Sequence, residues 1–349
     1  MTPARNLAAG LLAALWLIST AEQAAAGPLR DHWHERQAQR SAETEGMEAG
    51  DLAEMGGNAL NCADWSRRIE RLQERARGRR AGPSPDLGDV AYGPQARQKL
   101  DVFLPRDADK GGGAPIILMV HGGGWCVGDK AAEKVIANKV ARWTPRGFIV
   151  VSINYPMVGD GSDALAQAHH IARAAAFVQA TARAWGGDPR RLILMGHSAG
   201  AHLVSLVNAD ASIRNANAVR PILGAVSLDA GAIDVVRQMP NVYPFLKVRY
   251  REAFGDAESA WIAASPFHRI DGTAAPWLGV CSTTRRDDPC GQADAYAEKS
   301  RGFGVSAAVL PQHRSHGAIN ADLGMPGDYT RAVEAFMASL DSAVARRLR

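Results

Sequence analysis

Six short apolar runs rich in β-forming residues recur along this chain of 349 residues, and helix-like stretches separate most of them. The runs are APIILMV, GFIVVSINY, RLILM, PILGAVSL, APWLGVC and VSAAVLPQ. Continuous apolar strands that alternate with helices indicate a mostly parallel sheet, covered by helices on both faces. The predicted fold class is therefore α/β, and the alternating stretch QKLDVFLP, which stops at a proline, predicts one further strand before the six.

The run RLILM leads directly into a serine between two glycines, Gly196-His197-Ser198-Ala199-Gly200, and the apolar stretch AHLVSLV follows. A strand, a G-x-S-x-G turn and a helix together form a nucleophile elbow, in which the serine is held in a strained, exposed conformation. The turn is so tight that its flanking positions tolerate only very small residues. Ser198 is therefore predicted to be a catalytic nucleophile, next to a helix N-terminus that favours developing negative charge.

A second glycine-rich stretch, HGGGW at residues 121–125, follows the apolar run IILMV. Adjacent glycines let backbone N–H groups approach a developing oxyanion without obstruction from side chains. Such a loop can also hold phosphate, but the chain has no GxxxxGK[ST] motif and no G-x-G-x-x-G followed by an acidic ribose ligand. Together with the elbow, the pattern favours an oxyanion hole.

HGGGW and GHSAG together resemble the α/β-hydrolase esterases of the hormone-sensitive-lipase and carboxylesterase type. The stretch DVAYGPQARQKLDVFLP also resembles the two opening strands of bacterial members, and the similarity extends from about Asp89 to the C-terminus. The resemblance implies an α/β-hydrolase fold and an oxyanion hole formed by Gly123, Gly124 and Ala199. It also implies that no metal or organic cofactor is required, and Trp125 is expected to border the substrate pocket.

In this family the catalytic residues follow one another in the order serine, acid, histidine. The histidine is expected after the last apolar run, where His313 and His316 stand. His316 is preferred as general base because it lies farther from the strand end and precedes GAIN, which is typical of a helix start.

The acid is expected in the loop after APWLGVC, which offers Asp287 and Asp288. Asp288 is chosen because Pro289 fixes the backbone after it. Asp229 is a third candidate, since some hydrolases take their acid after an earlier strand.

The N-terminal residues 1–26 are predicted to be a secretory signal peptide. Arg5 precedes an apolar stretch from Leu7 to about Ile18, and the small residues 24–26 provide a cleavage site. Because this stretch is shorter than the roughly 20 apolar residues of a membrane-spanning helix, no stable membrane anchor is expected after cleavage. The predicted location is periplasmic or secreted.

Export changes the interpretation of the four cysteines, Cys62, Cys126, Cys281 and Cys290. In an oxidising compartment pairing is favoured over metal binding, and no C-x-x-C pattern supports a zinc ribbon. Four cysteines allow three pairings. We predict Cys281 with Cys290, which are close in the chain, and hence Cys62 with Cys126; four reduced, buried thiols are the alternative.

Two segments lie outside the regular strand–helix rhythm. Residues 27–88 are polar and expected to be partly helical or flexible, with one helix in Asp64–Arg80 that has Trp65 and Ile69 on one side. Residues 233–270 are rich in aromatics and prolines and are predicted to form a small lid-like insertion over the substrate pocket. The hydrolase domain itself is expected to span residues 89–349.

Taken together, the motifs predict a serine hydrolase that cleaves small-molecule carboxylic esters through an acyl-enzyme. The formal net charge of +4 is small and the basic residues are not gathered in one patch, so no nucleic-acid partner is expected. One alternative is an amide or formamide hydrolase of the arylformamidase type, and another is a non-catalytic hydrolase fold used for binding. The sequence does not indicate the oligomeric state or name the ester.

Overall fold

The computed structural model describes residues 61–75, 82–105, 113–243 and 246–349. All of them belong to the unit Glu48–Arg349. The predicted signal peptide, residues 1–26, lies outside the described residues. Within the described ranges, no helix is both long and apolar enough to cross a bilayer.

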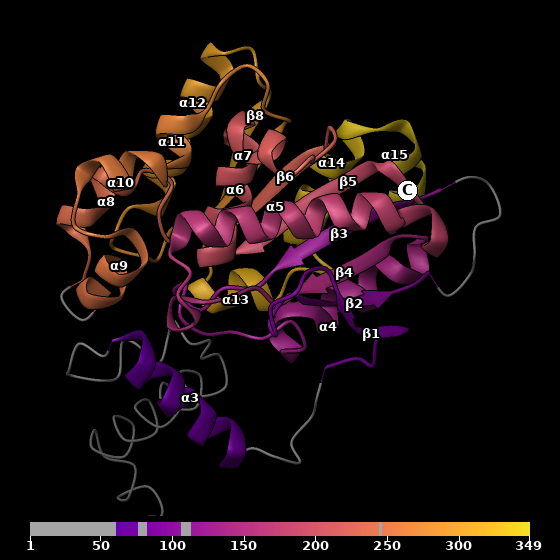
Figure 1. Cartoon of the computed structure of the whole chain (residues 1–349). Coiled ribbons are helices and arrows are strands. Elements are labelled where there is room, and N and C mark those ends of the chain that lie inside the picture. The colour runs from indigo at the N-terminus through magenta and orange to yellow at the C-terminus, as the bar shows by residue number, and fades with distance from the viewer. Residues whose placement is uncertain (1–60, 76–81, 106–112, 244–245) are drawn as a thin grey trace, which may run out of the picture. The chain divides into compact units, whose positions relative to one another are not determined.

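A sheet of eight strands in the order β1-β2-β4-β3-β5-β6-β7-β8 forms the centre of the fold (Figure 1). Strand β2 pairs antiparallel with β1 and β4, and all other pairs are parallel. The strands are β1 Leu87–Ala91, β2 Lys99–Phe103, β3 Ala114–Val120, β4 Ile149–Ile153, β5 Gly187–His197, β6 Gly224–Leu228, β7 Trp277–Ser282 and β8 Ala307–Gln312. The prediction of an α/β fold with a mostly parallel sheet is confirmed.

Helices cover both faces of this sheet because its central strands are apolar on both sides. In β3, for example, all seven residues are buried; Ile116 and Leu118 face one core, and Ile117 and Met119 face the other. The first core includes α5 Ala164–Thr181, α6 Ala199–Ala209, α7 Ala211–Ala216 and α12 Pro289–Gly302. The second includes α4 Glu133–Trp143, α13 His316–Ala321, α14 Asp328–Leu340 and α15 Ser342–Leu348. Each fully buried Leu or Ile stabilises the fold by about 1.5–3 kcal/mol.

The predicted insertion at residues 233–270 is present between β6 and β7. Its described part forms helices α8 Val235–Asn241, α9 Lys247–Phe254, α10 Glu258–Ala263 and α11 Pro266–Arg269. Figure 1 shows these helices grouped in orange at one side of the sheet. They are short because prolines and polar caps interrupt them, for example Pro240 inside α8 and Pro266 at the start of α11.

Before the first strand, the structure contains helix α3, Cys62–Arg75. It begins two residues before the predicted helix Asp64–Arg80, and residues 76–80 of that prediction lie outside the described residues. Trp65 is buried and Ile69 is partly buried, and both pack with Cys126 and Val127 in a small separate apolar cluster. The polar N-terminal segment thus has an apolar helix face that packs on the hydrolase domain.

Both predicted disulfides are present in the structure. Cys62 is bonded to Cys126, with 5.0 Å between their Cα atoms, and Cys281 is bonded to Cys290, with 5.2 Å. The second bridge joins strand β7 to the first turn of α12 and closes the loop between them.

Replacing both Cys281 and Cys290 with alanine should lower the free energy of unfolding by about 2.5 kcal/mol, because the bridged residues are 9 apart and a loop of this length has that closure entropy. Removing the Cys62–Cys126 bridge, whose residues are 64 apart, should cost more, about 4 kcal/mol. Urea unfolding of the oxidised proteins measures both. Equal stability of the Cys281/Cys290 double variant and the wild type would contradict the prediction.

Candidate active site

Ser198 lies at the junction between β5 and α6, at the position expected for a nucleophile elbow. Its backbone has φ 55° and ψ −117°, and its N–H donates to the carbonyl oxygen of Leu228 at 3.0 Å. A positive φ is uncommon for a residue other than glycine and persists only where the surroundings enforce it. The side chain is only partly buried, so the hydroxyl is accessible.

Each of the two glycines that flank the elbow is required by a different steric contact. A Cβ atom on Gly196 would lie 2.3 Å from the carbonyl oxygen of Gly200, and one on Gly200 would lie 2.3 Å from that of Val120. Both distances are too short for any side chain. The expectation that these positions require very small residues is confirmed, and α6 can begin directly against the end of β3.

His316 is the first residue of α13, and its Nδ1 lies 2.6 Å from Oδ2 of Asp229, the residue after β6. Asp229 is completely buried, and its Oδ1 accepts the N–H of Ser282 at 2.9 Å. Its own N–H donates to Val280 at 2.8 Å. The structure therefore pairs the preferred histidine with the third acid candidate.

The choice of Asp288 is corrected by this geometry. Asp288 is exposed and is the N-cap of α12, where it accepts the N–H of Gly291 and pairs with Arg237 at 2.7 Å. Asp288 has a left-handed φ of 53° and directly precedes the first residue of the helix. Its carboxylate therefore caps the first turn of α12 instead of reaching His316. Asp287 pairs with Arg285.

The rejected histidine, His313, is exposed. Its Nδ1 lies 3.5 Å from the hydroxyl of Thr283. His316, not His313, therefore lines the cavity that contains Ser198.

Arg285 is a member of this site that the sequence analysis did not single out. Its Nη1 lies 3.0 Å from Oδ2 of Asp229, and its Nε donates to Oδ1 of Asp287 at 2.9 Å. The same Nη1 is 3.4 Å from Nδ1 of His316. Nδ1 of His316 donates its hydrogen bond to Asp229 and therefore cannot accept one from Arg285. Arg285 is thus a nearby cation and not a hydrogen-bond donor to the ring.

The charges of Asp229, Arg285 and Asp287 stabilise one another. Burial alone would raise the pKa of Asp229, but the charge of Arg285 and the hydrogen bond from His316 outweigh burial and hold the pKa well below its usual range. Burial alone would lower the pKa of Arg285, but Asp229 and Asp287 raise it above the ordinary value. Asp229 therefore remains a carboxylate that can orient His316.

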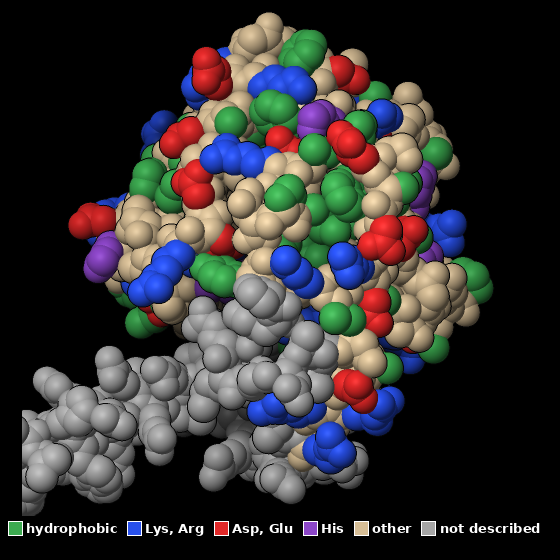
Figure 2. Space-filling model, turned by 90° about the vertical axis from the view of Figure 1, so that its left-hand side faces the viewer, with side chains coloured by type: hydrophobic (Ala, Val, Ile, Leu, Met, Phe, Trp, Pro, Cys, Tyr) green, Lys and Arg blue, Asp and Glu red, His purple; other side chains and the backbone are tan. Residues whose placement is uncertain are grey.

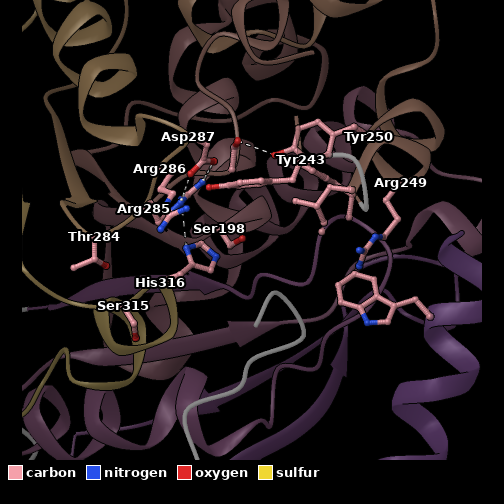
Figure 3. A pocket seen from close by; sticks show the side chains of 15 residues that line it. Ser198, Tyr243, Arg249, Tyr250, Thr284, Arg285, Arg286, Asp287, Ser315 and His316 are labelled. Atoms are coloured by element: carbon pink, nitrogen blue, oxygen red, sulfur yellow. Dashed lines mark hydrogen bonds and ion pairs between the residues drawn. The ribbon is translucent and has the colours of Figure 1, made fainter. Parts of the chain in front are cut away.

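Ser198 and His316 line one cavity of about 490 Å³ (Figure 3). In that view the imidazole of His316 projects toward Ser198, while Arg285 and Asp287 lie above it. The lid-like insertion contributes Tyr243, Leu246, Arg249 and Tyr250, and the remaining lining residues are Trp65, Gly124, Trp125, Gly231, Thr284, Arg285, Arg286, Asp287 and Ser315. The prediction that residues 233–270 help to line the pocket is confirmed.

The glycine-rich loop after β3 passes beside the nucleophile. A Cβ atom on Gly122 would lie 2.9 Å from Cβ of Ser198. Gly123 and Gly124 have left-handed φ values of 120° and 56°, and Ala199 is the first residue of α6, where backbone N–H groups have no acceptor within the helix. Of the three residues predicted for the oxyanion hole, Ala199 follows Ser198 in the chain and Gly124 lines the same cavity as Ser198, and Gly123 lies between Gly122 and Gly124 in the loop; their role stays a prediction.

Trp125 lines the cavity and is only 2% exposed. Its ring packs edge-to-face on Tyr250 and Phe254, with centroids 5.0 and 4.7 Å away. Its Nε1–H donates to Nδ1 of His202 at 3.2 Å, and Nε2 of His202 is 2.7 Å from the carbonyl of Ala264. These partners define a neutral His202 with its proton on Nε2, and they fix the indole; its contact with substrate stays a prediction.

One group among the described residues has the composition of a metal site: Cys62, Cys126 and Glu252. The two sulfurs are bonded to each other, and the carboxylate of Glu252 accepts the N–H of Cys62 at 2.7 Å. The arrangement is that of a structural junction, because a disulfide offers no thiolate to a metal ion.

Comparison with known proteins finds esterases among those similar to this chain. The BD-FAE family model matches residues 100–273. Esterase LipQ of Mycobacterium tuberculosis is 30% identical over 244 residues, which are 64% of this chain and 55% of LipQ. A probable isoprenylcysteine alpha-carbonyl methylesterase of Oryza sativa is 38% identical over 128 residues, 34% of this chain and 27% of that protein. The matched region thus spans about half of the first relative and about a quarter of the second.

Solved structures show the same fold. A truncated carbohydrate esterase from gut microbiota superposes with a TM-score of 0.61 at 19% identity, covering 74% of this chain and 99% of that one. Esterase 2 of Thermogutta terrifontis, phosphonylated by sarin, has a TM-score of 0.61 at 18% identity, covering 74% and 96%. These structures show the α/β-hydrolase fold that the motifs predicted, and in sequence the chain is similar to esterases.

The buried His202 should make stability depend on pH. Burial lowers its pKa to about 4, although the hydrogen bond to Ala264 raises it somewhat, whereas an exposed histidine titrates near 6.5. As the pH falls, the unfolded chain therefore binds this proton before the folded protein does. The contribution of neutral His202 to the free energy of unfolding is complete above about pH 6.5 and is lost toward pH 4. Between pH 7.5 and 4.5, wild type should lose about 2.5 kcal/mol more than His202→Gln.

Urea unfolding at the two pH values tests this, and His121, whose pKa burial also lowers to about 4, is retained in both proteins. An equal loss of stability in wild type and variant would show that His202 does not carry the effect.

Proposed function

We propose that the chain is a serine hydrolase that cleaves carboxylic esters through an acyl-enzyme, with Ser198, His316 and Asp229 as its triad. The observation that carries the proposal is the 2.6 Å contact between Nδ1 of His316 and the buried carboxylate of Asp229, beside a cavity that also contains Ser198. A histidine held by a buried acid, beside a cavity that contains a serine, is the arrangement that supports acyl transfer.

In this mechanism, Nε2 of His316 accepts the hydroxyl proton of Ser198 while Oγ attacks the ester carbonyl carbon. Asp229 stabilises the imidazolium that results, and Arg285 keeps Asp229 ionised. The backbone N–H groups of Gly123, Gly124 and Ala199 are the proposed donors to the oxyanion.

The imidazolium then protonates the leaving alcohol. A water molecule, deprotonated by the same nitrogen, then attacks the acyl carbon. The bond from this carbon to Oγ breaks, the acid is released and the imidazolium returns the proton to Ser198.

Ester cleavage is favoured over the two alternatives. The relatives named above are esterases by name, which supports an ester over an amide or formamide substrate. A non-catalytic binding role is disfavoured, because a histidine held by a buried acid in the cavity that contains Ser198 is the arrangement of a catalytic triad.

Export to a periplasmic or extracellular space is part of the proposal. Disulfides persist in oxidising compartments, and the two bridges of this structure support that location. Basic and acidic side chains are interspersed over the face shown in Figure 2, which supports a small-molecule substrate over a nucleic acid.

Ser198→Ala should reduce kcat/KM for p-nitrophenyl acetate by about 10⁴- to 10⁶-fold, because no other hydroxyl occupies the elbow. Far-UV circular dichroism should be unchanged, and Ser212→Ala, at an exposed position of α7, serves as control. The matching anilide, assayed with wild type, tests the amide alternative. Retention of ester cleavage by folded Ser198→Ala would refute the proposal.

The two acid candidates give a matched pair of variants. Asp229→Asn should lower kcat by about 10⁴-fold, because the ring loses the carboxylate that fixes its tautomer. Asp288→Asn should leave kcat within about threefold, since asparagine caps a helix as well as aspartate does. The reverse order of effects would restore Asp288 as the acid.

A further inference from the structure

One wall of the cavity comes from the part of the chain that precedes the region matched by the BD-FAE model. Trp65, on α3, lines the cavity together with Gly124 and Arg249. The family match begins only at residue 100. The side chain is 2% exposed, so it is a fixed part of the wall.

The indole of Trp65 is packed against two other parts of the cavity lining, the glycine-rich loop and helix α9. A Cβ atom on Gly124 would lie 3.0 Å from Cζ3 of Trp65, so the ring contacts the glycine-rich loop. On the other wall, the guanidinium carbon of Arg249, on α9, lies 4.2 Å from the ring centroid. A cation at this distance from an indole is attracted to the ring. Figure 3 shows Arg249 at the side of the cavity opposite Thr284 and Ser315.

One disulfide and two hydrogen bonds attach α3 to the residue after the glycine-rich loop and to α9. The disulfide joins Cys62 to Cys126, next to Trp125 in the glycine-rich loop. The N–H of Cys62 donates to Glu252 of α9 at 2.7 Å, and the hydroxyl of Ser66 donates to the carbonyl of Cys126 at 3.3 Å. Trp65 lies between Cys62 and Ser66 in the helix, so its position is fixed from both sides.

We propose that Trp65 is a specificity-determining residue that closes one end of the cavity and sets the length of the apolar ester group that fits there. The inference rests on the proposed ester hydrolysis. A rigid indole provides an apolar face to a short chain, and a longer chain would have to displace a ring that packing on both sides holds in place. The substrates that fit are esters with a short apolar group on the side that reaches Trp65.

Two substrate series test this with the full-length, oxidised protein. In one, p-nitrophenyl esters carry acyl chains from acetate to octanoate; in the other, acetates carry alcohols of increasing length. Wild type should prefer short members in the series whose variable group reaches Trp65. In Trp65→Ala, kcat/KM for the longest member relative to the shortest should rise at least 10-fold in that series, since even one methylene group in a pocket can change the ratio this much.

Ile69→Ala is the matched control, because Ile69 packs in the same apolar cluster but does not line the cavity. It should keep the wild-type length preference, and Trp65→Phe should lie between wild type and Trp65→Ala. A similar shift in Ile69→Ala would overturn the inference, because loosening of α3 would then explain the result.

Failure of this inference is distinguishable from failure of the proposed function. If wild type cleaves esters and folded Trp65→Ala keeps the wild-type length preference in both series, only the role of Trp65 is refuted. If wild type cleaves no member of either series, the proposed ester hydrolysis itself fails.

Discussion

The approach of the Gly200 backbone to the carbonyl of Val120 is the contact on which the rest of the site depends. With space for no side chain between them, α6 starts against the end of β3. Ser198 is consequently held at a positive φ above the sheet, and the loop that leaves β3 passes it at Gly122. Adjacent strands, β3 and β5, thus bring the nucleophile and the proposed oxyanion donors together.

A second constraint is electrostatic. A buried carboxylate costs several kcal/mol unless it is paired and hydrogen-bonded. Asp229 meets both conditions through Arg285, His316 and the N–H of Ser282. Asp287 in turn pairs with Arg285 from the other side. The loop that was expected to supply the acid therefore supplies the cation that stabilises the acid, and the Cys281–Cys290 bridge closes this loop.

The parts of the site that sequence predicts are those that local sterics determine. The elbow at Ser198 and the glycine loop need particular residues within a few positions of one another, so a short motif is sufficient. The acid depends on which strand ends lie next to His316 in space, and both Asp229 and Asp288 follow a strand. Only the structure shows that Asp288 is used as a helix cap.

Trp65 was expected on a helix but not in the cavity, because its partner Arg249 is far away in the chain. The predicted Cys62–Cys126 bridge, next to Trp125, was the one signal that pointed there.

Covalent trapping of the wild-type protein tests the central claim most directly. After reaction with a fluorophosphonate, intact-mass and peptide mass spectrometry should find one adduct per chain, on the peptide that contains Ser198, and ester cleavage should stop as the adduct accumulates. An adduct on a different residue, or cleavage that continues in fully modified protein, would contradict the account.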